Sequence, residues 1–406
     1  MRFVRVLAPA LFAFILAFGG LAALPGGAAA VSSASWTQFH YAATRSGYNP
    51  LEKTLNARNV GHLAVRWQKA LGNTVYSTPV VAGDRIFVDG YYGKLYALRL
   101  SDGKKLWTAT VGTESNSTPA IWSNLVITPG VDAAGGFVAA YDVASGARRW
   151  RTRLNVDQYS AITQPAVFGS SVYVSAGKSV YALSASDGRV LWNTRVTTSA
   201  DYFAMIDGPV AVSGYGEYVV AAGMDGHVYA LNATTGALHW DVVAGQGIDH
   251  GGPAIYSGIV YVPEGISNGA EGGGFYVSAL QVSDGRMLWQ SYAGDDIHVT
   301  PAAGNGTVVV GSIDEGLRAF NSRTGATLWT APSEGEVWGA PVLANGVVYA
   351  GTDVSLVVHD AATGASLYTF DMSGTTGMAA MASPAVVNGR VYTATGDGTI
   401  VVLGLP

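Results

Sequence analysis

The feature that most constrains the fold of this chain is a short motif that recurs along it. In the first copy, Leu95–Leu100 alternates in the manner of a strand, a Ser-Asp-Gly turn follows, and the return stretch carries Trp107. Each copy therefore predicts two antiparallel strands joined by a tight turn, in which the glycine can take a positive φ. The spacing is Ala, five residues, Gly, three residues, Trp, and its six faithful copies hold Ala97, Gly103, Trp107; Ala140, Gly146, Trp150; Ala182, Gly188, Trp192; Ala230, Gly236, Trp240; Ala279, Gly285, Trp289; and Ala319, Gly325, Trp329. A seventh copy is degenerate, with Val358, Gly364 and Tyr368.

The interval between copies indicates the architecture. Successive aromatic positions, counted from a lone return strand at Trp67, are separated by 39 (Trp329 to Tyr368) to 49 residues (Trp240 to Trp289). A period near 40 residues with several short strands per repeat is typical of a β-propeller, in which each blade is a four-stranded sheet. The sequence therefore predicts an all-β propeller with antiparallel blades.

A proline marker counts the blades independently. A proline precedes a short apolar stretch in each repeat, and proline is tolerated at the start of a strand. The eight prolines are Pro79, Pro119, Pro165, Pro209, Pro253, Pro301, Pro341 and Pro384. Only three strands can follow Pro384 before the chain ends, and the strand around Trp67 has no partner before it. We therefore expect eight blades, with Leu63–Leu71 pairing with the Thr399–Leu403 region to close the ring.

The N-terminus predicts a targeting segment. Arg2 and Arg5 precede an apolar stretch, and Gly26–Ala30 offers small residues for cleavage, which is typical of a secretory signal. The alternative is an uncleaved anchor helix. We assign 1–30 to the signal peptide, 31–60 to an N-terminal strap and 61–406 to the propeller. The strap either packs across one face or plugs the central channel.

Composition narrows the function. The chain has no cysteine, which excludes disulfides, covalent haem c and a lipid anchor on cysteine. Its formal charge of −5 becomes −7 when Arg2 and Arg5 are removed, and it has no basic run. Nucleic acid is therefore not an expected partner, and neither is a membrane after signal cleavage. We expect a monomer that is secreted or periplasmic.

The repeat resembles a known family. The Ala, Gly and Trp positions are similar to the tryptophan-docking repeat of quinoprotein dehydrogenases, of pyrroloquinoline-quinone (PQQ)-like propeller proteins and of the outer-membrane-protein assembly lipoprotein. The opening segment from Trp36 to Trp67 is also similar to theirs. This resemblance implies that each repeat tryptophan docks on the glycine turn of the next blade. The docking residues are then Trp67, Trp107, Trp150, Trp192, Trp240, Trp289, Trp329 and, in place of a tryptophan, Tyr368.

Polar residues cluster just before the opening prolines of three consecutive repeats. Asp249 and His250 precede Pro253; Asp295, Asp296 and His298 precede Pro301; Glu336 and Trp338 precede Pro341. His250, His298 and Trp338 stand three residues before their prolines, as do Tyr76 and Asn116 in the first two repeats, with Glu114 just ahead. Equal offsets predict that these residues meet at the mouth of the central channel. The candidate ligand-binding residues are Asp249, His250, Asp296, His298, Glu336, Trp338, Glu114, Asn116 and Tyr76.

Several functions remain open for this mouth. Its polarity is also what water-facing loops would show, and two histidines near carboxylates could bind a metal or transfer protons. The family resemblance implies a PQQ- and calcium-dependent alcohol or sugar dehydrogenase as one alternative, but the disulfide of many such enzymes is impossible here. We assign no catalytic residue, metal site or cofactor. We expect a non-catalytic binding or scaffold protein whose partner is another protein or a small polar ligand, cationic or rich in hydroxyl groups.

Overall fold

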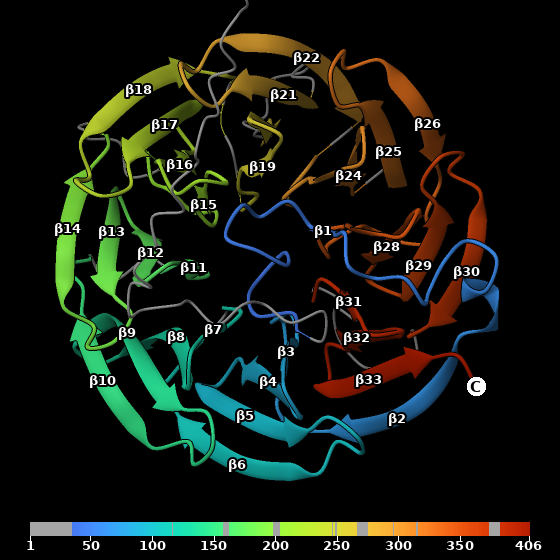
Figure 1. The fold of residues 1–406 in the computed structure, drawn as a ribbon, viewed down its shortest axis with the longest axis horizontal. Helices are drawn as coiled ribbons and strands as arrows, with labels where there is room; N and C mark the ends of the chain where they lie inside the picture. Colours follow the sequence, from blue (N-terminus) through green and yellow to red (C-terminus); the bar gives the residue numbers. More distant parts are fainter. Residues whose placement is uncertain are drawn as a thin grey trace, which may run out of the picture.

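A computed structural model describes residues 35–115, 117–156, 162–197, 204–245, 247, 250–265, 275–294, 296–313, 316–372 and 382–406. The expected signal peptide and the first residues of the expected strap lie outside these ranges. In the described part, the sheets are eight blades arranged in a ring (Figure 1). None of the described residues form a helix that is long and apolar enough to cross a membrane.

Each blade is built on four antiparallel strands, which in blades 1 to 7 run in sequence from the centre of the ring outward. Blade 1 contains β3 (Val80–Ala82), β4 (Arg85–Gly90), β5 (Lys94–Arg99) and β6 (Lys105–Thr110); blade 2 contains β7 (Ala120–Trp122), β8 (Leu125–Asp132), β9 (Gly135–Asp142) and β10 (Arg148–Arg153). Blade 3 contains β11 (Ala166–Phe168), β12 (Ser171–Ala176), β13 (Ser179–Ser184) and β14 (Val190–Arg195); blade 4 contains β15 (Ala211–Val212), β16 (Tyr218–Ala222), β17 (His227–Asn232) and β18 (Leu238–Val243).

The second half of the ring repeats this order. Blade 5 contains β19 (Ala254–Tyr256), β20 (Ile259–Glu264), β21 (Phe275–Gln281) and β22 (Met287–Gly294); blade 6 contains β23 (Ala302–Gly304), β24 (Thr307–Ser312), β25 (Gly316–Asn321) and β26 (Thr327–Ala331). Blade 7 contains β27 (Val342–Ala344), β28 (Val347–Gly351), β29 (Ser355–Asp360) and β30 (Ser366–Asp371); blade 8 contains β31 (Ala385–Val387), β32 (Arg390–Ala394), β33 (Thr399–Gly404) and β2 (Ala64–Ala70). The predicted all-β, eight-bladed propeller is confirmed.

The predicted ring closure is also confirmed. Strand β2 pairs antiparallel with β33, from Ala64 opposite Gly404 to Ala70 opposite Thr399. The outermost strand of blade 8 therefore comes from the N-terminal part of the chain and its other three strands from the C-terminal part. Closure leaves no blade at an open end of the ring, where an unpaired sheet face would be exposed to other chains.

Residues 36–49, which we call the plug segment, run inside the ring and contact the inner strand of every blade in turn (Figure 1, blue). The inner strand is the edge of its blade, and its backbone groups need a partner when they are buried. In six blades, the N–H of the second inner-strand residue donates to a carbonyl of the plug segment. These pairs are Val81 to Trp36, Ile121 to Thr37, Val212 to Ala43, Ile255 to Thr44, Ala303 to Ser46 and Leu343 to Gly47.

Side chains of the plug segment make the two remaining contacts. The Gln38 amide exchanges hydrogen bonds with the backbone of Val167 in blade 3, and the Asn49 amide donates to the Val386 carbonyl in blade 8 over 2.7 Å. The segment ends in β1 (Tyr48–Asn49), which adds a short parallel strand to β27, so blade 7 has five strands. Of the two alternatives for the strap, this part of it follows the channel-plug arrangement.

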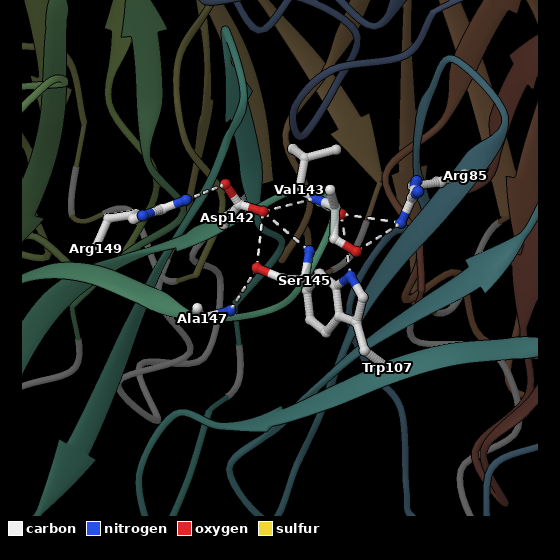
Figure 2. Close-up of polar contacts among 8 residues, drawn as sticks. Arg85, Trp107, Asp142, Val143, Ser145, Ala147 and Arg149 are labelled. Carbon is white, nitrogen blue, oxygen red and sulfur yellow. Dashed lines mark hydrogen bonds and ion pairs between the residues drawn. The ribbon is translucent and has the colours of Figure 1, made fainter.

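The repeat tryptophans connect neighbouring blades. Figure 2 shows the contact between blades 1 and 2, where Trp107 Nε1 donates to the Val143 carbonyl over 3.0 Å and Arg85 donates to the same carbonyl. Asp142 holds the receiving turn by accepting hydrogen bonds from Ser145 N–H and Arg149 (Figure 2). The other six repeat tryptophans donate in the same way, to the carbonyls of Leu100, Ala185, Ala233, Val282, Ser322 and Ala361.

The degenerate seventh repeat has a topological cause. A repeat tryptophan docks on the turn between the two outer strands of the next blade, and for Tyr368 that blade is blade 8. Its outer strands β33 and β2 come from opposite ends of the chain, so no such turn joins them. Tyr368 instead packs against the buried cluster that contains Val60, and β30 lies beside the short 3₁₀ helix η1 (Val60–His62), in which Gly61 lies against the backbone of Leu367.

Candidate functional site

A cavity of about 460 Å³ lies at the centre of the ring, where the loops that precede the inner strands converge. All eight blades contribute to its lining, from Thr78 in blade 1 to Ser383 in blade 8. Phe39 of the plug segment also lines it, so one end of the cavity rests on that segment. The cavity is therefore a pocket in the mouth of the ring.

The structure brings most of the sequence-selected mouth residues to this cavity. Tyr76, Glu114, His250, His298 and Trp338 all line it. Two others do not line it but contact residues that do: the Asp296 carboxylate is 2.8 Å from His298 Nε2, and the Glu336 carboxylate accepts a 2.8 Å hydrogen bond from Trp338 Nε1. Asp249 and Asn116 lie outside the described residues.

Three rings form a row along one wall. The His250 and His298 rings are 5.8 Å apart, and His298 stacks on the Trp338 indole at 5.5 Å with an interplanar angle of 14°. These residues come from blades 5, 6 and 7 and share the same offset from their prolines. The repeat geometry that predicted equivalent positions therefore accounts for the row.

Asp207 was missed by the sequence reasoning. Its carboxylate lies 2.5 Å from His250 Nδ1 and it lines the cavity from blade 4. It stands two residues before Pro209, so the search at offsets of three to five residues passed over it. The backbone is strained at two of these positions. His250 and Asp296 take positive φ values of 56° and 38°, which are unusual and energetically unfavourable for residues other than glycine.

The opposite wall carries two tyrosines. Tyr76 and Tyr91 pack edge to face with ring centroids 5.6 Å apart, and both line the cavity. Tyr91 lies in the hairpin between β4 and β5, a region that the proline offset does not reach. Glu114 of blade 2 is close by, because Ser115 N–H donates to the Tyr91 carbonyl over 2.9 Å. The Glu114 side chain is exposed to solvent.

Hydroxyl groups form a collar that ties the blades together below the mouth. Thr118 Oγ1 accepts from Thr78 N–H at 2.9 Å, Thr300 Oγ1 accepts from Gly252 N–H at 3.0 Å, and Ser383 Oγ accepts from Ala340 N–H at 2.9 Å. Each acceptor belongs to the blade after its donor and stands directly before the opening proline. These hydroxyls are therefore already used for contacts between blades.

A buried carboxylate lies behind the tyrosine wall. Asp89 is almost fully buried and accepts hydrogen bonds from Ser115 Oγ at 3.2 Å and from Thr128. Its second oxygen, Oδ1, has no partner among the described residues. Burial raises the pKa of Asp89 to about 7, although the two hydroxyl donors act in the opposite direction.

The lining is acidic and aromatic. Glu114 and Asp207 are carboxylates, and no Lys or Arg is among the described residues that line the cavity. Nor does the described part of the chain contain a group of three or more His, Asp or Glu residues that could hold a metal ion. The arrangement offers aromatic faces, two imidazoles and negative charge to a bound molecule.

Comparison with known proteins places this fold in a family. The family model described as outer membrane protein assembly factor BamB matches residues 57–135, 134–291 and 273–405. Tetrathionate hydrolase of Acidithiobacillus ferrooxidans is 26% identical over 337 residues, and BamB of Yersinia pestis is 31% identical over 218 residues. These alignments cover 76% and 48% of this chain, and they span only 60% and 51% of the two relatives.

Solved structures share the fold at low sequence identity. BamB from Moraxella catarrhalis superposes with a TM-score of 0.65 at 19% identity, covering 84% of this chain and 97% of that one. A europium-containing methanol dehydrogenase superposes with a TM-score of 0.72 at 13% identity, covering 92% and 98%. The match of the family model to almost the whole ring shows that this chain belongs to the PQQ-like repeat β-propeller family described as outer membrane protein assembly factor BamB.

Proposed function

We propose that this protein is a non-catalytic binding protein that works outside the cytoplasm as a monomer and takes a small polar ligand in its central cavity. The proposed ligand-binding residues are those selected at the mouth: Asp249, His250, Asp296, His298, Glu336, Trp338, Glu114, Asn116 and Tyr76. Asp207 and Tyr91 join them because they line the same cavity.

The observation that supports this proposal is a cavity of about 460 Å³ with convergent polar groups and an end on the plug segment. Ligand sites are typically concave, about 300–1,000 Å³ in volume, and lined by apolar and aromatic side chains with a few placed polar groups. The carboxylate partners Asp207, Asp296 and Glu336 orient the ring nitrogens of His250, His298 and Trp338. The resulting wall is ordered before any ligand arrives, which reduces the entropic cost of binding.

The described lining offers no Lys or Arg side chain to the cofactor of the dehydrogenase alternative. Pyrroloquinoline quinone carries carboxylate groups, which positive charge in a site would balance. The described lining instead presents Glu114 and Asp207 without a Lys or Arg. The residues at the mouth therefore favour a ligand other than this quinone.

A protein partner at the same face is the second candidate. Family membership favours it, because relatives from Yersinia pestis and Moranella endobia are named outer membrane protein assembly factor. In this case the mouth loops would contact a segment of the partner, and the acidic face would select a basic one.

Thermal shift and calorimetry with a panel of small polar compounds test the proposal. We expect at least one compound to raise the melting temperature of the wild type, and Trp338→Ala to abolish that shift. Trp122→Ala is the matched control, because Trp122 lies on the inner strand of blade 2, is not part of the lining, and bonds to Gly169. Tight binding of pyrroloquinoline quinone with Ca²⁺, together with dye-coupled oxidation of an alcohol or sugar, would overturn the non-catalytic proposal.

A further inference from the structure

We infer that the ligand of the central cavity is a small organic cation, an amine or a quaternary ammonium compound, whose charged group lies against Tyr76, Tyr91 and Glu114. This inference rests on the proposed binding function and adds the chemical class of the ligand.

The charge of the cavity favours a cation. Glu114 and Asp207 line the cavity, and the carboxylates of Asp296 and Glu336 contact its His298 and Trp338 rings. The segments between residues 116 and 381 that lie outside the description contain no Lys, Arg or His, so they cannot supply a positive charge wherever they lie. Their acidic residues are Asp157, Asp201, Asp249, Glu271, Asp295, Asp314 and Glu315. A concave site with one sign of charge concentrates ligands of the opposite sign.

The aromatic rings of the cavity also favour a cation. Tyr76 and Tyr91 meet edge to face at 5.6 Å and 73°, and both side chains line the cavity. A cation over a tyrosine ring is attracted by the ring quadrupole, and paired aromatic rings are how proteins hold quaternary ammonium groups. The Ser115 N–H donates to the Tyr91 carbonyl, which keeps the neighbouring residue Glu114 close to the two tyrosines. Glu114 therefore supplies a full negative charge beside them.

Glu114 differs from the other carboxylates of the mouth. Asp207 is engaged by His250, Asp296 by His298 and Glu336 by Trp338. Glu114 is exposed, and its carboxylate has no hydrogen bond or ion pair within the described part of the chain. It is therefore the acidic group that is ready to pair with a ligand cation.

The hydroxyl collar argues against a sugar, the other class that the mouth could take. Thr118, Thr300 and Ser383 accept bonds from neighbouring blades, Ser115 donates to Asp89, and Thr163 is bonded to Ser175 at 2.6 Å. A sugar needs many free donors and acceptors, because each of its hydroxyls loses water on binding. A hydroxyl that accepts one bond keeps its own O–H for donation, so these contacts reduce what the collar can offer a sugar without removing it. The tyrosine faces and the Glu114 carboxylate are therefore the main groups for recognition.

Ligands that share one ring and differ in charge test the inference. Benzyltrimethylammonium, benzyl alcohol and benzoate would be titrated into the purified protein by calorimetry, with glucose as the hydroxyl-rich comparison. We expect the cation to bind at least about tenfold more tightly than benzyl alcohol, and its affinity to fall with added salt. Binding of glucose or benzoate as tight as that of the cation would overturn the inference.

Substitution of Glu114 tests whether its carboxylate is the group that pairs with the ligand cation. Glu114→Gln should weaken benzyltrimethylammonium about tenfold and leave benzyl alcohol unchanged. Glu334→Gln is the matched control, because Glu334 is an exposed carboxylate that does not line the cavity. Equal effects of the two variants would overturn the inference. If a neutral compound binds instead and Trp338→Ala abolishes that binding, the cation inference fails while the proposed binding function stands. If none of the four compounds binds, the inference fails, and the wider panel decides the binding function.

Discussion

At the scale of single residues, the repeat tryptophan and the glycine that receives it form one structural unit. Gly325 has a φ of 70°, and a Cβ placed on it would lie 2.7 Å from the Trp289 indole. Glycine is therefore required twice, for the left-handed backbone and for the close approach of the ring. The indole N–H also donates to the carbonyl of Ser322 over 3.0 Å. These two demands explain why the spacing of Gly and Trp is so regular.

Removing a docking tryptophan should destabilise the ring strongly. Trp289 is 9% exposed and packs against Tyr261 and Phe320. We expect Trp289→Ala to lower the free energy of unfolding by about 3–5 kcal/mol, the usual range for emptying a large buried site. Trp122→Ala should cost less, because that side chain is partly exposed and is not at the repeat position. Urea denaturation measures both, and equal losses would contradict the docking role.

The buried carboxylate of Asp89 predicts a pH dependence of stability. Because burial raises its pKa to about 7, the native state holds a proton that the unfolded chain releases near pH 4. Between these values the native state binds more protons, so the free energy of unfolding should fall as the pH rises from about 4 to 7. Asp89→Asn should flatten part of this decline and stabilise the protein at pH 8.

Glu264 provides a second site for the same measurement. Burial raises its pKa to about 7 as well, and Gln290 donates to its carboxylate over 2.8 Å. Glu264→Gln should flatten a further part of the decline, and the double variant should flatten more than either single one. Denaturation curves collected from pH 4 to 8 give the slopes, and an unchanged slope in Asp89→Asn would contradict the assignment.

At the scale of elements, the sequence predicted the blades and their order but left open whether the N-terminal strap crosses one face or plugs the channel. The regular offset of His250, His298 and Trp338 from their prolines was enough to predict that the three side chains meet at the mouth, because similar blades place residues of equal offset side by side. The plug segment has no repeat and no hydrophobic period, so its path around the inner strands could not be read from its sequence. Tyr91 was not predicted as a lining residue for a related reason, since it reaches the cavity from the β4–β5 hairpin and not from a loop before an opening proline.

The plug segment depends on a buried arginine. Arg45 is fully buried, and its guanidinium donates to the carbonyls of Phe39, Gln164 and Val210. Arg45→Met would leave these buried acceptors without donors, at roughly 1–3 kcal/mol each. We expect a loss of several kcal/mol in stability and faster cleavage of the segment by thermolysin. Lys53→Met is the control, since Lys53 is exposed, and a similar effect in both variants would count against this role.

At the scale of the whole molecule, the order of blades around the ring explains both the cavity and the one irregular repeat. Eight similar blades bring eight loops to a single mouth, so a functional site can arise from residues far apart in sequence, such as Tyr76 and Trp338. The same ring must be closed somewhere, and closure with β2 and β33 removes one docking turn. Tyr368 stands where that turn is missing, a relation that the degenerate spacing alone did not reveal.

Closure can be tested with a disulfide, because the chain contains no cysteine that could compete. Ala70 and Thr399 are opposite each other in the β2–β33 pair, and directly opposed residues of an antiparallel pair lie within reach of a disulfide. We expect Ala70→Cys/Thr399→Cys to oxidise readily to a monomeric cross-linked form. The bond would join the two ends of the ring and limit the unfolded chain, with a stabilisation of up to about 4–5 kcal/mol.

The control moves one cysteine by a single residue. In Lys69→Cys/Thr399→Cys the two side chains point to opposite faces of the sheet, because side chains alternate along a strand, so the cross-link should form poorly. Mass spectrometry with and without reductant measures the bond, and thermal melting measures the stabilisation. Efficient oxidation of both pairs would mean that β2 slips against β33. A cross-linked first pair with no gain in melting temperature would mean that opening of the ring at this junction does not limit its stability.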